Sequence, residues 1–186
     1  MSNSIYFLRH AETKVDKTKP VREWNLTRDG IRETKELASS DAFDKIDCVV
    51  YSSEKKAIGT AKILSKELSV QMYELPEFDE LKRENDKFLT NEEYRKSVRQ
   101  TLVDWEHNVP SWESAQSALQ RMLDGIRRIN IMFYDNNVIA VSHGIVLSIL
   151  FSHLRGLESI AYERWSRLPF LSWGLIRENK VLVDLI

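Results

Sequence analysis

The sequence has few of the residues that build disulfides, nucleotide loops or metal sites. Its single cysteine, Cys48, excludes an internal disulfide, and the apolar segment around it, residues 46–51, predicts a buried strand with a structural thiol. Only six glycines are present, and none lies in a GxGxxG or GxxxxGK pattern, so no glycine-rich phosphate loop is expected. No His and Cys residues cluster at ligand spacing, so we expect neither a metal nor a cofactor.

The sequence also lacks a surplus of one charge and a long apolar run. Its 27 basic and 28 acidic residues give a net charge of -1, which argues against nucleic acid or an anionic membrane as a partner. The most apolar stretch, residues 145–154, is too short to span a bilayer, and residues 1–4 do not begin a signal peptide. We therefore expect a cytoplasmic location, and the length predicts a single domain over residues 1–186.

Apolar segments of two periodicities alternate along the chain. Short apolar runs predict strands at residues 5–8, 46–51, 70–75 and 138–142, and a terminal hairpin at residues 173–177 and 181–186. Helical spacing predicts helices at residues 28–40, 55–68, 92–105, 111–133 and 144–154. Thr27 is the expected N-cap of the first helix, and Pro110 and Ser111 mark the expected start of the fourth. The alternation predicts an α/β fold, a three-layer αβα sandwich whose mainly parallel sheet contains one antiparallel strand.

Two histidines directly follow apolar strands. His10 follows the first strand and His143 follows a late one, whereas His107 and His153 are assigned surface or structural roles. Ligands in open α/β sheets bind beyond the carboxyl ends of the strands. We therefore expect His10 and His143 to meet at one edge of the sheet.

The residues beside these histidines suit a phosphate group. A neutral imidazole at His10 is a nucleophile for phosphorus, and the Arg9 guanidinium offers a bidentate contact to phosphate oxygens. Thr13 places a hydroxyl a short distance along the chain. Ser142 and Gly144 flank the second histidine at the head of a predicted helix, where free N–H groups and the helix dipole favour an anion.

Four motifs in order resemble the histidine phosphatase superfamily, also called the phosphoglycerate mutase-like family. They are Arg9-His10-Ala11, the Leu-Thr-x-x-Gly stretch at residues 26–30, the Ser-Ser segment from residue 52 to Ala61, and the late His143. The resemblance covers nearly the whole chain. It implies that His10 is the phosphorylated nucleophile and that Arg9 and His143 hold the phosphoryl group.

The resemblance also implies a carboxylic acid after the third strand. Glu80 matches the family pattern best and is the candidate proton donor, with Glu77, Asp79 and Glu84 as alternatives. A surface role for any one of these four carboxylates is the competing interpretation.

Three positions depart from the family pattern. Ala11 replaces the glycine of the first motif. Lys56 stands where the family has a second arginine, in a segment one residue shorter, and keeps the charge without the bidentate fork. A solvated helix lysine is the alternative interpretation of Lys56. Asp16 falls where mutase-type members have asparagine, and its carboxylate would repel an anionic substrate.

The function implied is that of a histidine acid phosphatase-type phosphoric monoester hydrolase. It would cleave a small phosphorylated metabolite through a phosphohistidine on His10, with Glu80 as acid and then base, as a monomer or homodimer. The alternatives are a cofactor-dependent phosphoglycerate mutase, a protein phosphohistidine phosphatase and an inactive scaffolding relative. The short stretch between Glu80 and Ser111 leaves little room for the cap of a mutase, and a pure scaffold has no chemical need for two histidines.

Overall fold

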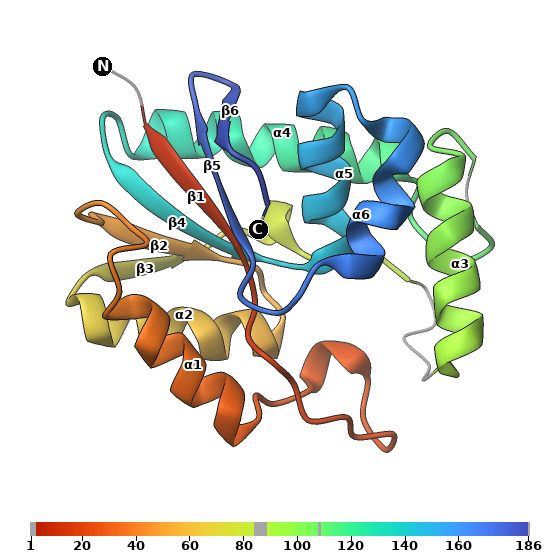
Figure 1. Ribbon diagram of the computed structural model, residues 1–186, viewed down its shortest axis with the longest axis horizontal. Coiled ribbons are helices and arrows are strands. Elements are labelled where there is room, and N and C mark those ends of the chain that lie inside the picture. Colours follow the sequence, from red (N-terminus) through yellow and green to blue (C-terminus); the bar gives the residue numbers. More distant parts are fainter. Residues whose placement is uncertain (1–2, 84–88, 108, 186) are drawn as a thin grey trace.

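The computed structural model describes residues 3–83, 89–107 and 109–185. Its six-stranded sheet has the order β3-β2-β4-β1-β5-β6 (Figure 1). The strands are β1 Ser4–Arg9, β2 Cys48–Tyr51, β3 Gln71–Glu74, β4 Asn137–Ser142, β5 Trp173–Arg177 and β6 Lys180–Val183. Strands β1 to β4 pair in parallel, and β5 pairs antiparallel with both β1 and β6. This confirms the predicted sheet with one reversed strand.

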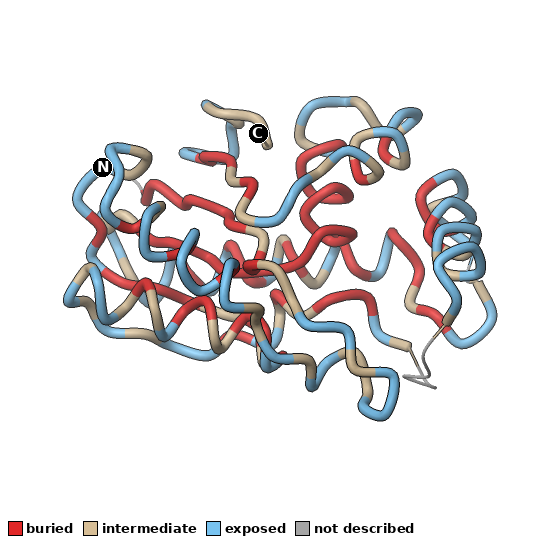
Figure 2. Tube along the Cα trace, turned by 60° about the horizontal axis from the view of Figure 1, so that its bottom comes forward, coloured by how far each residue is buried: buried red, intermediate tan, exposed pale blue. Residues whose placement is uncertain are grey.

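Helices cover both faces of the sheet and form the predicted three layers. α1 and α2 lie on one face, whereas α4 and α5 lie on the other (Figure 1). Side chains alternate along β1, so that Ile5 and Phe7 join the core on the α4–α5 side and Tyr6 and Leu8 join the core on the α1–α2 side. Figure 2 shows the buried residues concentrated along the central strands. The helix bounds are α1 Arg28–Ala38, α2 Lys55–Leu68, α3 Asn91–Val103, α4 Ala115–Met132, α5 Gly144–Arg155 and α6 Ala161–Arg167.

Two parts of the helix prediction are wrong. The short helix α6 is absent from it, and α4 begins at Ala115 rather than at Ser111. Ser111 has a left-handed φ of 65°, and Ser114 is the cap that accepts the N–H of Ser117. Residues 111–114 instead dock on the chain after β3, where the N–H of Glu113 donates to the carbonyl of Lys82. No helix in the part of the chain described here is long and apolar enough to cross a membrane.

The start of α1 holds the loop that follows His10. The Thr27 hydroxyl accepts the N–H of Gly30 at 2.9 Å, as predicted for an N-cap, and donates to Glu12 Oε2 at 2.7 Å. The N–H of Thr27 donates to the Glu12 carbonyl at 2.9 Å. From α2, the Thr60 hydroxyl accepts the N–H of Ala11 at 3.0 Å. The stretch at residues 26–30 and the segment from residue 52 to Ala61 therefore both hold the backbone next to His10 in place.

Replacing Gly30 with alanine is expected to destabilise the protein by about 1–3 kcal/mol. The added Cβ would lie 2.7 Å from the Glu12 carbonyl oxygen and 3.0 Å from the Glu12 nitrogen, both of which are backbone atoms. Gly59→Ala is the matched control, because its Cβ meets only the flexible Leu26 side chain, at 3.2 Å. Equilibrium unfolding in urea measures both variants. Equal stabilities would show that the loop at Glu12 moves aside without cost.

Candidate active site

The two histidines lie side by side at one edge of the sheet. β1 and β4 are parallel neighbours, with Arg9 opposite Ser142 in the register. The N–H of His10 donates to the Ser142 carbonyl at 2.9 Å, and the His10 and His143 ring centroids are 5.1 Å apart. Both rings are buried. This edge is where parallel strands present their carboxyl ends, the usual ligand position in such sheets.

A cavity of about 340 Å³ opens at this edge. Of the residues singled out from the sequence, its lining includes Arg9, His10, Thr13, Lys56, Glu80 and Gly144. His143 is fully buried and does not line the cavity. Ser142 is also buried, and its hydroxyl donates to the Phe78 carbonyl. Asp16 lies outside the lining, where its carboxylate accepts from the N–H and hydroxyl of Thr18.

The hydrogen bonding of His10 leaves one ring nitrogen for chemistry. Its Nδ1 lies 2.8 Å from the Ala11 carbonyl, which can only accept, so Nδ1 carries the proton. Burial lowers the pKa of His10 well below its ordinary value, and the neighbouring His143 and Lys56 lower it further. The ring is therefore neutral, with its lone pair on Nε2. A neutral imidazole of this kind is a nitrogen nucleophile.

Two buried nitrogens near His10 lack a hydrogen-bond partner among the described residues. They are Arg9 Nε and His143 Nδ1. The Arg9 guanidinium lies 4.3 Å from the centroid of the Phe170 ring, and its Nη1 donates to the Leu168 carbonyl. A Cβ at Gly144 would lie 3.2 Å from Arg9 Nε, so the glycine lets the guanidinium pack against the start of α5. Unpaired buried nitrogens are costly, and an anion in the cavity, which Arg9 lines, would offer Arg9 Nε an acceptor.

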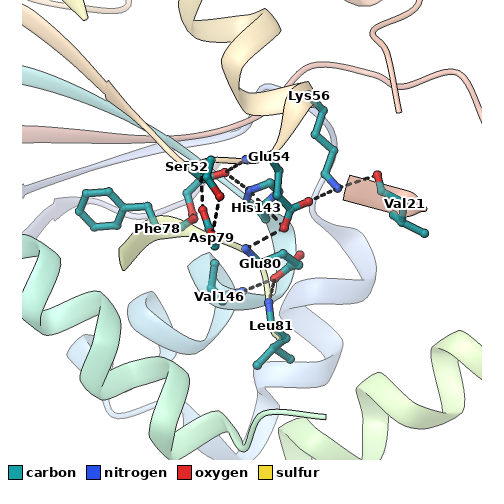
Figure 3. Close-up of polar contacts among 12 residues, drawn as sticks. Val21, Ser52, Glu54, Lys56, Phe78, Asp79, Glu80, Leu81, His143 and Val146 are labelled. Atoms are coloured by element: carbon teal, nitrogen blue, oxygen red, sulfur yellow. Dashed lines mark hydrogen bonds and ion pairs between the residues drawn. The ribbon is translucent and has the colours of Figure 1, made fainter. Parts of the chain in front are cut away.

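Lys56 is buried at 4% exposure, so the interpretation of it as a solvated helix lysine is wrong. Its Nζ lies 2.5 Å from Glu54 Oε2 and donates to the Val21 carbonyl at 3.2 Å (Figure 3). Glu54 was missed by the sequence analysis. Its other oxygen, Oε1, accepts the N–H of Glu80 at 3.1 Å, and it lies 3.9 Å from Nε2 of His143.

Among the carboxylates considered as the acid, Glu80 reaches the cavity. Glu77 pairs with Arg128, and Asp79 accepts from the N–H and hydroxyl of Ser53 at 2.6 and 2.7 Å. Glu84 lies outside the described residues. Burial raises the pKa of Glu80, and the Glu54 carboxylate adds to the rise. A raised pKa suits a group that must carry a proton before it donates one.

The first N–H groups of α5 bind the Glu80 carboxylate. Ile145 N donates to Glu80 Oε2 and Val146 N donates to Oε1, both at 3.2 Å (Figure 3). From the sequence we expected these N–H groups to be free for a phosphate. The carboxyl oxygens of Glu80 instead accept from two of them.

Arg121 on α4 fixes the loop that carries Glu80, and it too was missed. Its Nη1 donates to the carbonyls of Glu77 and Asp79 at 2.8 and 2.9 Å, while Nε and Nη2 contact the two carboxylate oxygens of Glu113. The helical pattern around Arg121 gives no sign of this role, because the partners are backbone atoms distant in sequence. Within the described residues, no group of three or more His, Cys, Asp or Glu side chains is arranged to hold a metal ion.

Known proteins resemble this chain in sequence and in fold. A family model of the histidine phosphatase superfamily (branch 1) matches residues 5–177. The adenosylcobalamin/alpha-ribazole phosphatase of Escherichia coli (strain K12) is 25% identical over 190 residues, which cover 97% of this chain and 93% of that protein. PhoE of Bacillus subtilis (strain 168), an uncharacterized phosphatase, is 22% identical over 156 residues, covering 82% of this chain and 78% of that protein. The structure of a mycobacterial glucosyl-3-phosphoglycerate phosphatase shares the fold, with a TM-score of 0.77, 15% identity, and coverage of 100% of this chain and 98% of that one.

Lowering the pH below the ordinary histidine value is expected to weaken the fold. The unfolded chain takes up protons on His10 and His143, whereas burial keeps both rings neutral in the folded state. Stability therefore falls with pH by about 1.4 kcal/mol per pH unit for each ring below about pH 6.5. In His10→Gln the free energy of unfolding is expected to fall less steeply with pH, by the amount that one ring contributes. Urea unfolding at a series of pH values measures this slope. His153→Gln, at an exposed position, is the control, and an unchanged slope in His10→Gln would contradict the burial argument.

Proposed function

The chain belongs to the histidine phosphatase superfamily, branch 1, and from this premise we propose that it is a phosphomonoesterase with a phosphohistidine intermediate on His10. Its substrate is a small phosphorylated metabolite. The observation that carries the proposal is the neutral His10 ring, whose Nδ1 faces the Ala11 carbonyl. That ring shares a cavity with Arg9 and Lys56, the two cations that a phosphate dianion requires.

In the first half-reaction, His10 Nε2 attacks phosphorus in line with the ester oxygen. The P–N bond forms as the P–O bond to the alcohol breaks, and Glu80 gives its proton to the departing oxygen. Glu80 is left ionised. The N–H groups of Leu81, Ile145 and Val146 already donate to its carboxylate, so its new charge is stabilised without rearrangement.

In the second half-reaction, water attacks the phosphohistidine. Glu80 takes the proton of the water, the P–O bond forms, and the P–N bond breaks to return His10 to its neutral state. The Arg9 and Lys56 side chains stabilise the charge on the equatorial oxygens in both steps. His143 is proposed to hold the same oxygens: its ring centroid lies 5.1 Å from that of His10 and its Nδ1 has no partner among the described residues, although the ring itself does not line the cavity. Inorganic phosphate leaves, and the protonation states match those at the start.

A phosphoenzyme formed on His10 is the direct test. A brief reaction with ³²P-labelled phosphate monoester, quenched in base, is expected to label the wild-type chain with a base-stable, acid-labile phosphate. His10→Ala is expected to lose the label and at least about a thousandfold in kcat. His153→Ala, an exposed histidine, is the control. A label that persists in His10→Ala would overturn the proposal, and faster transfer to monophosphoglycerate than to water would identify a mutase instead.

The pH dependence of kcat/KM is expected to be shifted toward acid. His10 reacts while neutral, and its lowered pKa keeps it neutral well into the acid range. Glu80 donates only while protonated, so activity on an alkyl phosphate falls as the pH rises through its raised pKa. Steady-state rates from about pH 4 to about pH 9 measure both limbs. Glu80→Gln is expected to lose the alkaline limb, and retention of that limb would assign the acid to another group.

A further inference from the structure

The cavity beyond the phosphate-binding groups has a largely apolar wall. Four aromatic and three aliphatic residues from separate parts of the chain form it: Trp24, Tyr94, Trp165, Phe170, Val15, Val21 and Leu89. Beyond the groups assigned to catalysis, the polar side chains in the described lining are Thr13, Arg83 and Asn91. The Arg83 guanidinium already lies over the Tyr94 ring at 5.6 Å.

This wall discriminates between classes of phosphate ester. A polyhydroxylated alcohol gives up hydrogen bonds to water on entering, and each one left unmade costs about 1–3 kcal/mol. A flat apolar group loses no hydrogen bonds there and gains contact with the rings. We infer that the substrate is a phosphate monoester whose alcohol carries a flat apolar or aromatic group. This inference rests on the proposed function and names the chemical class of its substrate.

Two primary alkyl esters test the inference without a difference in leaving-group chemistry: 2-naphthylmethyl phosphate and glycerol 3-phosphate. The naphthylmethyl ester is expected to have a kcat/KM at least about tenfold higher. Trp24→Ala is expected to reduce that ratio severalfold. Val15→Asp, at a position 56% exposed, adds a charge to the wall without disturbing the core and is expected to reduce it as well. Tyr134→Ala, at an exposed position outside the cavity lining, is the control and should leave the ratio unchanged.

The outcomes separate the inference from the proposed function. Equal efficiency for the two esters, with phosphohistidine formed from both, overturns the inference and leaves the phosphatase in place. Absence of phosphohistidine with both esters overturns the function itself. An unchanged ratio in both Trp24→Ala and Val15→Asp shows that the wall does not select the alcohol.

A second inference comes from the buried carboxylate pair of Glu54 and Glu80. These residues are 9% and 7% exposed. Glu54 spans the gap between Lys56 and Glu80, because Oε2 lies 2.5 Å from the ammonium and Oε1 accepts the Glu80 N–H at 3.1 Å (Figure 3). A carboxylate that bonds an ammonium stays ionised, and a second carboxyl beside it is favoured in the neutral form.

Charges of both signs surround Glu80. The groups that act on it are the cations Arg9, Lys56, Arg83 and Arg121, the Tyr94 phenol and the Glu54 carboxylate. The cations and three backbone N–H groups favour the ionised form, whereas burial and Glu54 favour the protonated form. The negative charge of Glu54 also neutralises the Lys56 ammonium, so that this cation lowers the pKa of Glu80 less. We propose that Glu54 is a positioning residue that stays ionised and holds Glu80 as a protonated donor.

The position of the alkaline limb of kcat/KM tests this role. Glu54→Gln keeps the shape and an acceptor oxygen but removes the charge, so the limb is expected to move to lower pH by about one unit. Glu54→Asp keeps the charge, so its alkaline limb is expected to stay close to the wild-type position. Glu67→Gln removes a carboxylate at an exposed position of α2 and is the control, which should leave the limb in place. A purely structural Glu54 would lower the rate at every pH without moving the limb.

A direct titration of the wild-type protein tests the protonation of Glu80 without relying on rates. Carboxyl ¹³C shifts of glutamate-labelled wild type are expected to show one buried group titrating above the ordinary range, and Glu80→Gln is expected to remove it. A Glu80 that titrates in the ordinary range overturns the role of Glu54. Loss of the alkaline limb in Glu80→Gln without a shift in Glu54→Gln also overturns that role, while the proposed function stands.

Discussion

The pairing of β1 with β4 is the contact on which the whole site depends. β1 lies at the start of the described chain and β4 begins only at Asn137, yet their register sets Arg9 opposite Ser142 and brings the imidazoles of His10 and His143 together. A slip of one residue would turn every side chain of a strand to the other face. The Ile5, Phe7 and Ala140 side chains pack in the core on the α4–α5 side of the sheet, and this packing fixes the register.

The second requirement is a carboxyl held still beside this pair. Three elements hold it: α5 through its first N–H groups, α4 through Arg121, and the loop after β2 through Ser53 and Glu54. Gly125 on α4 adds a close approach, since a Cβ there would lie 2.7 Å from the Phe78 ring. The carboxyl of Glu80, the proposed acid, is therefore part of the packed core, although the described residues between β3 and Arg83 form no helix beyond a short 3₁₀ turn, Pro76–Phe78.

The sequence predicted the sheet, most helices and the meeting of His10 with His143, because strand length, periodicity and the carboxyl-end rule are local signals. It failed where tertiary contacts decide. Lys56 was a candidate phosphate ligand with a solvated helix lysine as the alternative, and only its burial against Glu54 decides against the second. Helix α6 has only seven residues, too few for a clear periodic pattern. The start of α4 moved because residues 111–114 dock on the chain after β3.

The reversed strand β5 has a consequence for biosynthesis. It lies directly beside β1, and the loop before it supplies Phe170 and the Leu168 carbonyl to Arg9. A ribosome releases the first strand long before this segment emerges. The nascent chain therefore carries an open strand edge, and a guanidinium without its aromatic cover, until nearly the last residues of the family domain leave the exit tunnel. The contacts that hold the Arg9 side chain can therefore form only late in synthesis.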